Sequence, residues 1–260
     1  MQANSDKGKV IFFGTGTSHG VPVMMCTCKV CSSTDSRDKR FRSSILYEKD
    51  STRILIDCGP DFRSQFLAFG TGQLSAVFLT HIHYDHVGGL DDLRPFSYKN
   101  GLDVYASEDT IQAIKEKSPY LFKGIARLGL PVLRFHTLMP YLPVMINDVE
   151  VIPFTVFHGK MPILGYKIGD FAYITDAATI PQETLELIHG IKVLVVNALR
   201  TSSHPAHMNL TQALDVIKLT GAQTAYLTHM SHQIGLHSEL EQKLPENVHP
   251  AYDGLTLEVN

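Results

Sequence analysis

The stretch FLTHIHYDHVGGL, residues 78–90, places three histidines and one aspartate within six positions. The apolar run AVFL, residues 76–79, precedes them, so they begin where a buried strand is expected to end and a loop to open. His81 and His83 are two apart in an extended chain and therefore project to the same side, which suits one metal ion. Asp85 and His86, in the turn beyond, can face a neighbouring metal. A solvated polar loop is the alternative, and this spacing directly after an apolar strand makes it the weaker interpretation.

Around this stretch, short β-branched and aromatic runs alternate with a few helical patterns. The sequence predicts strands over residues 9–14, 43–48, 53–59, 76–80, 103–106, 149–158, 164–169, 171–175, 192–198, 224–229 and 255–259, the second and third as a hairpin. Helical spacing covers residues 107–117, 181–189 and 209–221, the last closing at Gly221, where a left-handed cap is expected. More strands than helices predict an α/β protein, one domain over residues 1–260 with two sheets face to face and helices outside. The weakly periodic residues 95–131 predict a lid or an inserted lobe.

Composition and charge limit the classes of function that the protein can have. The chain has 260 residues, 44% of them hydrophobic, which is enough to bury a full core. The formal net charge is −3, and the 23 Lys and Arg form no dense run that would follow a phosphate backbone, so no nucleic-acid partner is expected. Residues 1–10 lack the apolar core of a signal peptide and no later apolar run is long enough to span a bilayer, so we expect a cytoplasmic protein without a membrane partner.

The segment THIHYDH resembles the HxHxDH motif of the metallo-β-lactamase superfamily. This resemblance implies an αββα four-layer sandwich and three further ligands in order along the chain, each at a strand end. The candidates are His158 after VEVIPFTVF, Asp176 after FAYIT and His229 after TAYLT. By the same resemblance, the first metal is bound by His81, His83 and His158, the second by Asp85, His86 and His229, and Asp176 bridges both.

Two divalent cations at such a site imply a hydrolase. They lower the pKa of a bridging water from 15.7 to about 7, so that hydroxide is available as a nucleophile at neutral pH. They also polarise the attacked group and neutralise its developing charge. The donor set accepts zinc or manganese, and also nickel or iron. Aspartate at position 176, rather than cysteine, resembles the dinuclear phosphodiesterases and thioesterases of the superfamily.

A second metal site is expected at MCTCKVC, residues 25–31. Three cysteines within six positions leave a tetrahedral metal one ligand short, and in a reducing compartment such clusters bind metal more often than they form disulfides. The segment THMSHQ, residues 228–233, supplies His232. A closed site of Cys26, Cys28, Cys31 and His232 would hold a structural zinc, whereas reduced, uncoordinated thiols are the alternative. Cys58 is expected to be a small core residue.

Five motifs together resemble the phosphoribosyl 1,2-cyclic phosphate phosphodiesterase branch of the superfamily, known from phosphonate breakdown. They are GTGTSHGVP, CTCKVC, THIHYDH, ITDAA and THMSHQ, spread over residues 14–233. The branch implies a small phosphorylated substrate, such as a phosphoribosyl cyclic phosphate. A pyrroloquinoline-quinone biosynthesis protein of the same superfamily also has a cysteine cluster near its start, so the structural zinc does not by itself fix the substrate.

The segment SSHPAHMNLTQAL, residues 202–214, carries His204 and His207 before a predicted helix. In the phosphodiesterase branch and in related transfer-RNA processing nucleases, a histidine shortly before this helix contacts the scissile phosphate, and His207 matches that position best. An imidazolium there could stabilise the transition state and protonate the departing alkoxide. We therefore name Asp85 and His207 as catalytic residues, with an exposed loop position as the alternative for both histidines of the segment.

Other functions remain open at this point. A thioester, lactone or lactam hydrolase of the same fold would need no histidine facing a phosphate. A non-hydrolytic cofactor-biosynthesis protein would hold a lone or labile metal and turn nothing over. Nuclease activity is disfavoured by the acidic charge balance and the absence of a basic arm. A homodimer is compatible with the sequence.

Overall fold

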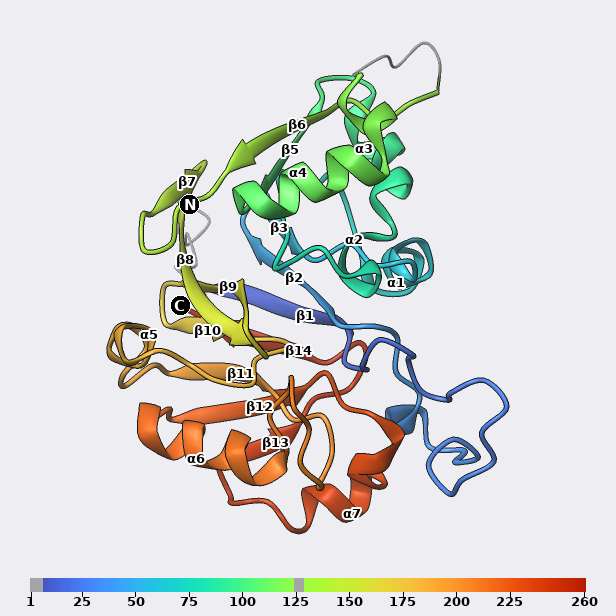
Figure 1. Cartoon of the computed structure of the whole chain (residues 1–260), viewed down its shortest axis with the longest axis vertical. Helices are drawn as coiled ribbons and strands as arrows, with labels where there is room; N and C mark the ends of the chain where they lie inside the picture. Colours follow the sequence, from blue (N-terminus) through green and yellow to red (C-terminus); the bar gives the residue numbers. More distant parts are fainter. Residues whose placement is uncertain (1–6, 124–128) are drawn as a thin grey trace, which may run out of the picture.

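Two mixed sheets pack face to face and carry helices on their outer faces (Figure 1). The structure is a computed structural model that describes residues 7–123 and 129–260. The first sheet has the strand order β14 (Thr256–Val259), β1 (Gly8–Gly14), β2 (Ser44–Lys49), β3 (Thr52–Ile56), β4 (Ala76–Phe78), β5 (Leu102–Ala106) and β6 (Leu133–Thr137). The second has the order β13 (Val248–Pro250), β12 (Thr224–Thr228), β11 (Val193–Asn197), β10 (Phe171–Tyr173), β9 (Met161–Ile168), β8 (Val149–His158) and β7 (Val144–Ile146).

Each sheet is antiparallel in one half and parallel in the other. Strands β3 to β6 run parallel in the first sheet, and β10 to β13 run parallel in the second. The expected hairpin is confirmed as the antiparallel pair β2 and β3, in which Lys49 faces Thr52. The carboxyl ends of parallel strands meet at one edge of a sheet, which is where α/β proteins commonly build their sites. Every residue expected to bind one of the two catalytic metal ions either ends a strand or lies in the loop that follows one.

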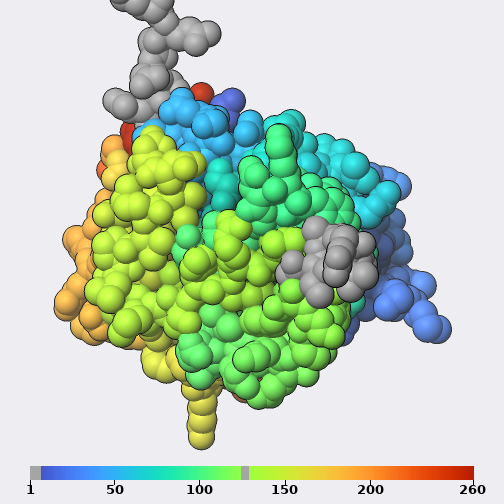
Figure 2. Space-filling view, turned by 90° about the horizontal axis from the view of Figure 1, so that it is seen from above, coloured from blue at the N-terminus to red at the C-terminus, as the bar shows by residue number. Residues whose placement is uncertain are grey.

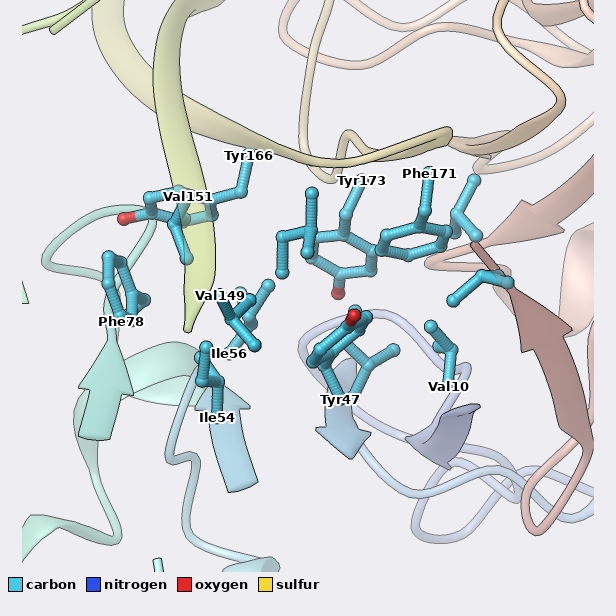
Figure 3. Packing of buried hydrophobic residues seen from close by; sticks show 14 of the residues in the cluster. Val10, Tyr47, Ile54, Ile56, Phe78, Val149, Val151, Tyr166, Phe171 and Tyr173 are labelled. Atoms are coloured by element: carbon cyan, nitrogen blue, oxygen red, sulfur yellow. The ribbon is translucent and has the colours of Figure 1, made fainter. Parts of the chain in front are cut away.

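The core between the sheets is built from aromatic and β-branched side chains. In Figure 3, Phe171 and Tyr173 of the second sheet point toward Tyr47 and Val10 of the first. The ring of Phe78 meets Tyr166 edge to face, with centroids 5.3 Å apart. Such pairs contribute about 0.5–1.5 kcal/mol beyond the area they bury. The contact lies three residues before His81, so the core packs directly beneath the histidine stretch.

Backbone groups also join the two sheets at this point. The Tyr166 hydroxyl donates to the carbonyl of Leu79, and the N–H of Leu164 donates to the carbonyl of Thr80 at 3.0 Å. Both acceptors lie immediately before His81, so the loop with the histidines begins from a segment tied to both sheets. A shift of one sheet against the other would therefore move the ligands.

Helices complete the outer layers. They are α1 (Phe62–Phe69), α2 (Tyr84–Val87), α3 (Arg94–Ser97), α4 (Glu108–Lys117), α5 (Gln182–Leu187), α6 (Leu210–Thr220) and α7 (His237–Glu241). One apolar cluster joins α1 and α4 to the first sheet, and another joins α5 and α6 to the second. The expected four-layer αββα order is thereby confirmed. Within the described ranges, no helix combines the length and the apolar character that a membrane span requires.

The three expected helices are confirmed as α4, α5 and α6. Ser107 accepts from the N–H of Thr110 at the start of α4, and Asn209 forms a capping box with Gln212 on α6. Gly221 ends α6 at φ 63°, as the sequence predicts. The sequence did not predict α1, α2, α3, α7, β6, β7 or β13, most of which are short.

The range 95–131, expected as a lid or lobe, contains β5, which pairs with both β4 and β6. Viewed from above, the segments carrying β5, α4, β6 and β7 cover one face of the molecule (Figure 2). Residues 124–128 lie outside the described residues. Both the lid and the single domain over 1–260 stay predictions.

Candidate dinuclear metal centre

The expected catalytic ligands converge at one edge of the sandwich as two groups. The first contains His81, His83, His158 and Asp176, and the second contains Asp85, His86, Asp176 and His229. Within each group, one nitrogen or oxygen atom of every residue lies within 4.8 Å of the others. Asp176 belongs to both groups, which is the position of a bridging carboxylate. The structure thus brings together all seven residues in the grouping that the resemblance implies, and their role as ligands stays a prediction.

In the first group, two histidine nitrogens face each other closely. The Nε2 of His81 lies 3.0 Å from the Nδ1 of His83 and 3.9 Å from a carboxylate oxygen of Asp176. His158 lies 2.7 Å through Nδ1 from the carbonyl oxygen of Ala206, so Nδ1 donates and the other nitrogen keeps its lone pair. Burial, and then the charge of His86, hold the pKa of His81 well below its usual range, which keeps this imidazole neutral as metal ligation requires.

In the second group, His86 offers the sharpest test of whether a cation fits. Its ring is fully buried, and Nδ1 lies 2.7 Å from Oδ2 of Asp57, an acceptor that fixes the proton on Nδ1. The opposite nitrogen, Nε2, is buried without a hydrogen-bond partner and lies 3.2 Å from Asp85 and 3.3 Å from Asp176. A neutral His86 would point a lone pair at two carboxylates, which is repulsive unless a proton or a metal cation lies between them. The residues therefore fit a metal ion.

Asp57 holds this arrangement in place. Its buried carboxylate accepts hydrogen bonds from the N–H of Thr80 at 2.8 Å and from the Thr80 hydroxyl at 3.0 Å, besides the contact with His86. A carboxylate at the end of a strand can cap the strand or orient the loop beside it, and these contacts show that Asp57 orients the histidine loop. Thr80 in turn lies 2.9 Å from Nδ1 of His81, so one carboxylate orients a candidate ligand of each group.

The charges of the cluster depend on one another. Burial alone would lower the pKa of His86, but the carboxylates of Asp176, Asp57 and Asp85 raise it well above its usual range. Burial would likewise raise the pKa of Asp176, yet His229 and His86 hold it well below. Asp85 and Asp176, whose pKa values both lie below the usual range, are therefore ionised and need compensating positive charge. Bound cations supply that charge and would displace the proton from His86.

Three residues of the site have left-handed backbone conformations. Asp57, Asp176 and His229 have φ of 65°, 58° and 53°. Such conformations cost non-glycine residues of order 1–3 kcal/mol and persist where the surrounding structure imposes them. Each lies just after a strand, where the chain must turn its side chain into the cluster. The strain is offset by the hydrogen bonds and strand pairing around it.

Threonines precede three of the candidate ligands, a feature that the sequence interpretation missed. The pairs are Thr80 and His81, Thr175 and Asp176, and Thr228 and His229. The hydroxyl of Thr175 donates to the Asp176 carboxylate at 2.6 Å. From the loop after β1, Thr17 places its hydroxyl 3.1 Å from Nε2 of His229. This repeated threonine directly before a ligand is a sequence pattern that could have been recognised.

The three clustered cysteines meet His232 as expected. Its Nδ1 lies 3.3 Å from the sulfurs of Cys26 and Cys28 and 3.4 Å from that of Cys31. A hydrogen bond from the backbone of Cys31 lowers the pKa of Cys28 to about 6, whereas burial raises the pKa of Cys31 to about 11. The thiol of Cys28 is thus easier to ionise than that of Cys31, and metal binding would favour the thiolate form of both. Cys58 is fully buried in the core.

His207 lies against both groups. Its ring stacks on His229 with centroids 5.1 Å apart, lies 4.5 Å from the ring of His158, and has a buried Nδ1 without a hydrogen-bond partner. Burial, and then the charge of His229, lower its pKa to about 3. The imidazolium expected from the sequence is thus disfavoured here, and an anion bound alongside would favour it. His204 lies farther out, with its ring 4.9 Å from that of His207.

A family model described as a Beta-lactamase superfamily domain matches residues 52–230, which carry the seven candidate ligands. The chain belongs to the metallo-β-lactamase superfamily. Within it, a crystal structure of a new diphosphatase from the PhnP family is 35% identical, with 97% of each chain covered and a TM-score of 0.91. The recognition of superfamily and branch from the motifs is thereby confirmed.

Two proteins that are similar to this chain in sequence are named for different activities. An octanoyltransferase of Porphyromonas gingivalis is 43% identical over 249 residues, which are 95% of this chain and 51% of that protein. The chain therefore spans about half the length of that relative. A ribonuclease Z of Methanococcus maripaludis is 22% identical over 305 residues, with 92% of each chain covered.

Asp57→Asn should weaken binding at the second metal position. The amide would present N–H where His86 needs an acceptor, so that imidazole would no longer be held with its lone pair toward Asp85 and Asp176. Loss of such an orienting partner typically weakens metal affinity about 10–100-fold. Metal content after dialysis, measured by plasma mass spectrometry, should fall by one equivalent. Asp215→Asn, on the exposed face of α6, is the control, and full metal content in Asp57→Asn would contradict the assignment.

Cys28→Ser should remove one equivalent of zinc and leave the two metal ions of the dinuclear centre bound. Because the site ties residues 26–31 to His232, the loss should also lower the midpoint of thermal unfolding. Cys58→Ala is the matched control, since that thiol is in the core and should not change the zinc content. Equal zinc in wild type and Cys28→Ser would leave the cysteines as free thiols.

Proposed function

We propose that the protein is a metal-dependent hydrolase that cleaves a phosphodiester, preferentially a small cyclic phosphate. The observation that carries the proposal is the position of Asp176 in both ligand groups, since a shared carboxylate is what a two-metal site requires. The similarity to a PhnP-family diphosphatase supports attack at phosphorus. A diphosphate is the substrate class chemically most similar to a phosphodiester, because its attacked phosphorus also carries a bridging oxygen as leaving group.

The residues fit two divalent cations, as the two groups of donor atoms and the buried, unpartnered Nε2 of His86 indicate. When bound, the cations would lower the pKa of a water and neutralise charge on the phosphoryl oxygens, as expected from two-metal phosphatases. The chain's own contribution is to hold the site rigidly. Asp57 orients the imidazole of His86, and the carbonyl of Ala206 orients that of His158. The packing of the two sheets holds both histidines in place.

His207 contributes a polar group that no other side chain satisfies. Its buried Nδ1 lies 3.9 Å from a carboxylate oxygen of Asp176, and the residue lines the pocket beside the cluster, where a phosphate oxygen would be bound. Binding of an anion there would raise the pKa of this imidazole, which could then donate a proton to the departing oxygen. Stacking on His229 sets the plane of the ring before substrate arrives.

Hydrolysis of an acyl thioester is the second candidate. The observation that favours it is the identity of 43% to an octanoyltransferase, although the matched region is about half of that protein. An acyl chain needs an apolar groove, and the groove between α1 and α3, with a volume of about 460 Å³, is lined by none of the candidate ligands. The pocket beside His207 is instead lined mainly by polar side chains. We therefore rank the phosphodiester first.

His207→Ala should lower kcat for bis(p-nitrophenyl) phosphate about 100- to 1,000-fold and leave both metals bound, because the ring contacts substrate rather than metal. His204→Ala, at a ring that contacts His207 but belongs to neither ligand group, should lower kcat less than tenfold. Turnover and metal content are measured on the same samples. Unchanged turnover in His207→Ala would remove its catalytic role. Hydrolysis of octanoyl thioesters without any phosphodiester turnover would replace the proposal with the second candidate.

A further inference from the structure

The turn GTGTSHG, residues 14–20, joins β1 to the loop that carries the cysteines, and none of its residues belongs to either ligand group. Its second threonine nevertheless lies in the site. The side chain of Thr17 is buried, and its hydroxyl is 3.1 Å from Nε2 of His229. On the other side of the same ring, Nδ1 lies 3.0 Å from a carboxylate oxygen of Asp176. One nitrogen of His229 therefore faces the ligand group, and the other faces the threonine.

The hydroxyl of Thr17 can decide which nitrogen of His229 has the proton. A neutral imidazole has one N–H and one lone pair, and only the nitrogen with the lone pair can bind a cation. If Thr17 accepts from Nε2–H, the lone pair is on Nδ1 and faces Asp176. The opposite tautomer would point a proton at Asp176 and leave no lone pair for a metal there. His86 is held by the same principle, with Asp57 as its acceptor.

Backbone hydrogen bonds hold Thr17 against His229. Gly16 forms a parallel bridge with Met230, the residue directly after the histidine. The N–H of Met230 donates to the carbonyl of Thr15 at 2.9 Å, and the N–H of Thr17 donates to the carbonyl of Met230 at 3.1 Å. The hydroxyl and the imidazole thus come from two segments that pair with each other beside the contact.

A buried polar network anchors the same turn. Arg40 donates through Nη1 to the hydroxyl of Thr15 at 2.7 Å and to the carbonyl of Ala251 at 2.6 Å. The hydroxyl of Thr15 donates in turn to the carboxylate of Asp253 at 2.8 Å. A Cβ added to Gly16 would lie 2.9 Å from the Cβ of Arg40, so the turn packs closely on this arginine. The position of the turn is therefore fixed by contacts that need no metal.

We propose that Thr17 is a positioning residue for the second metal ion: its hydroxyl accepts the Nε2 proton of His229 and holds the Nδ1 lone pair toward Asp176. The inference rests on the two-metal site of the proposed function and is independent of the substrate. Loss of such an orienting partner typically weakens metal affinity about 10–100-fold. The effect should be confined to the second metal, because His229 belongs to the second ligand group alone.

The test compares Thr17→Val, which removes the hydroxyl from a side chain of nearly the same shape, with Thr17→Ser, which keeps the hydroxyl. Protein freed of its catalytic metals is titrated with manganese in a calorimeter. Thr17→Val should bind the second manganese about 10–100-fold more weakly than wild type, whereas Thr17→Ser should stay within about threefold. Thr184→Val is the matched control, because that buried hydroxyl on α5 donates to the carbonyl of Thr155 and should leave both manganese affinities unchanged.

The outcomes separate this inference from the proposed function. Equal affinity for the second manganese in Thr17→Val and wild type would overturn the positioning role. A loss in Thr17→Val that Thr17→Ser shares to the same extent would assign the effect to packing and overturn it as well. A wild type that binds a single catalytic manganese would instead overturn the two-metal centre itself. Because no substrate enters the titration, a thioester hydrolase with two metals would leave the role of Thr17 intact.

Discussion

The hydrogen bond between His86 and Asp57 is the contact on which the site depends. At 2.7 Å it fixes the proton on one nitrogen and turns the other toward two ionised carboxylates. Asp57 can serve this role because β3 and β4 run parallel and end side by side, which brings residues 57, 80 and 86 together. The parallel half of the first sheet therefore contributes more than hydrophobic core residues. It also positions the charged side chains whose negative charge two metal ions would neutralise.

The second sheet supplies the rest of the centre by the same means. Asp176 and His229 follow parallel strands of that sheet, and both reach the cluster through left-handed backbone conformations. Hydrogen bonds from Tyr166 and Leu164 join the sheets directly before His81. The cysteine site adds a further tie, because its histidine lies three residues beyond His229. The contacts that join the two sheets thus also hold the ligands together, and the backbone strain at Asp176 and His229 is offset by that packing.

Sequence reasoning reached the parts of this site that have a local signal. His81, His83, Asp85 and His86 lie within six residues, and their spacing alone indicated metal. His158, Asp176 and His229 are separated by long stretches and could be assigned only through resemblance to a family. The partner of Asp57 could not be assigned, because its contact with His86 depends on which strand ends are neighbours.

The central claim is that these residues hold two metal ions with Asp176 between them. Anomalous scattering from crystals grown with manganese tests it most directly. The account predicts two manganese peaks about 3.5–4 Å apart, both in contact with Asp176, and a separate zinc peak at the three cysteines and His232. A single ion bound by His81, His83 and His158 alone, with His86 turned away from the cluster, would contradict it.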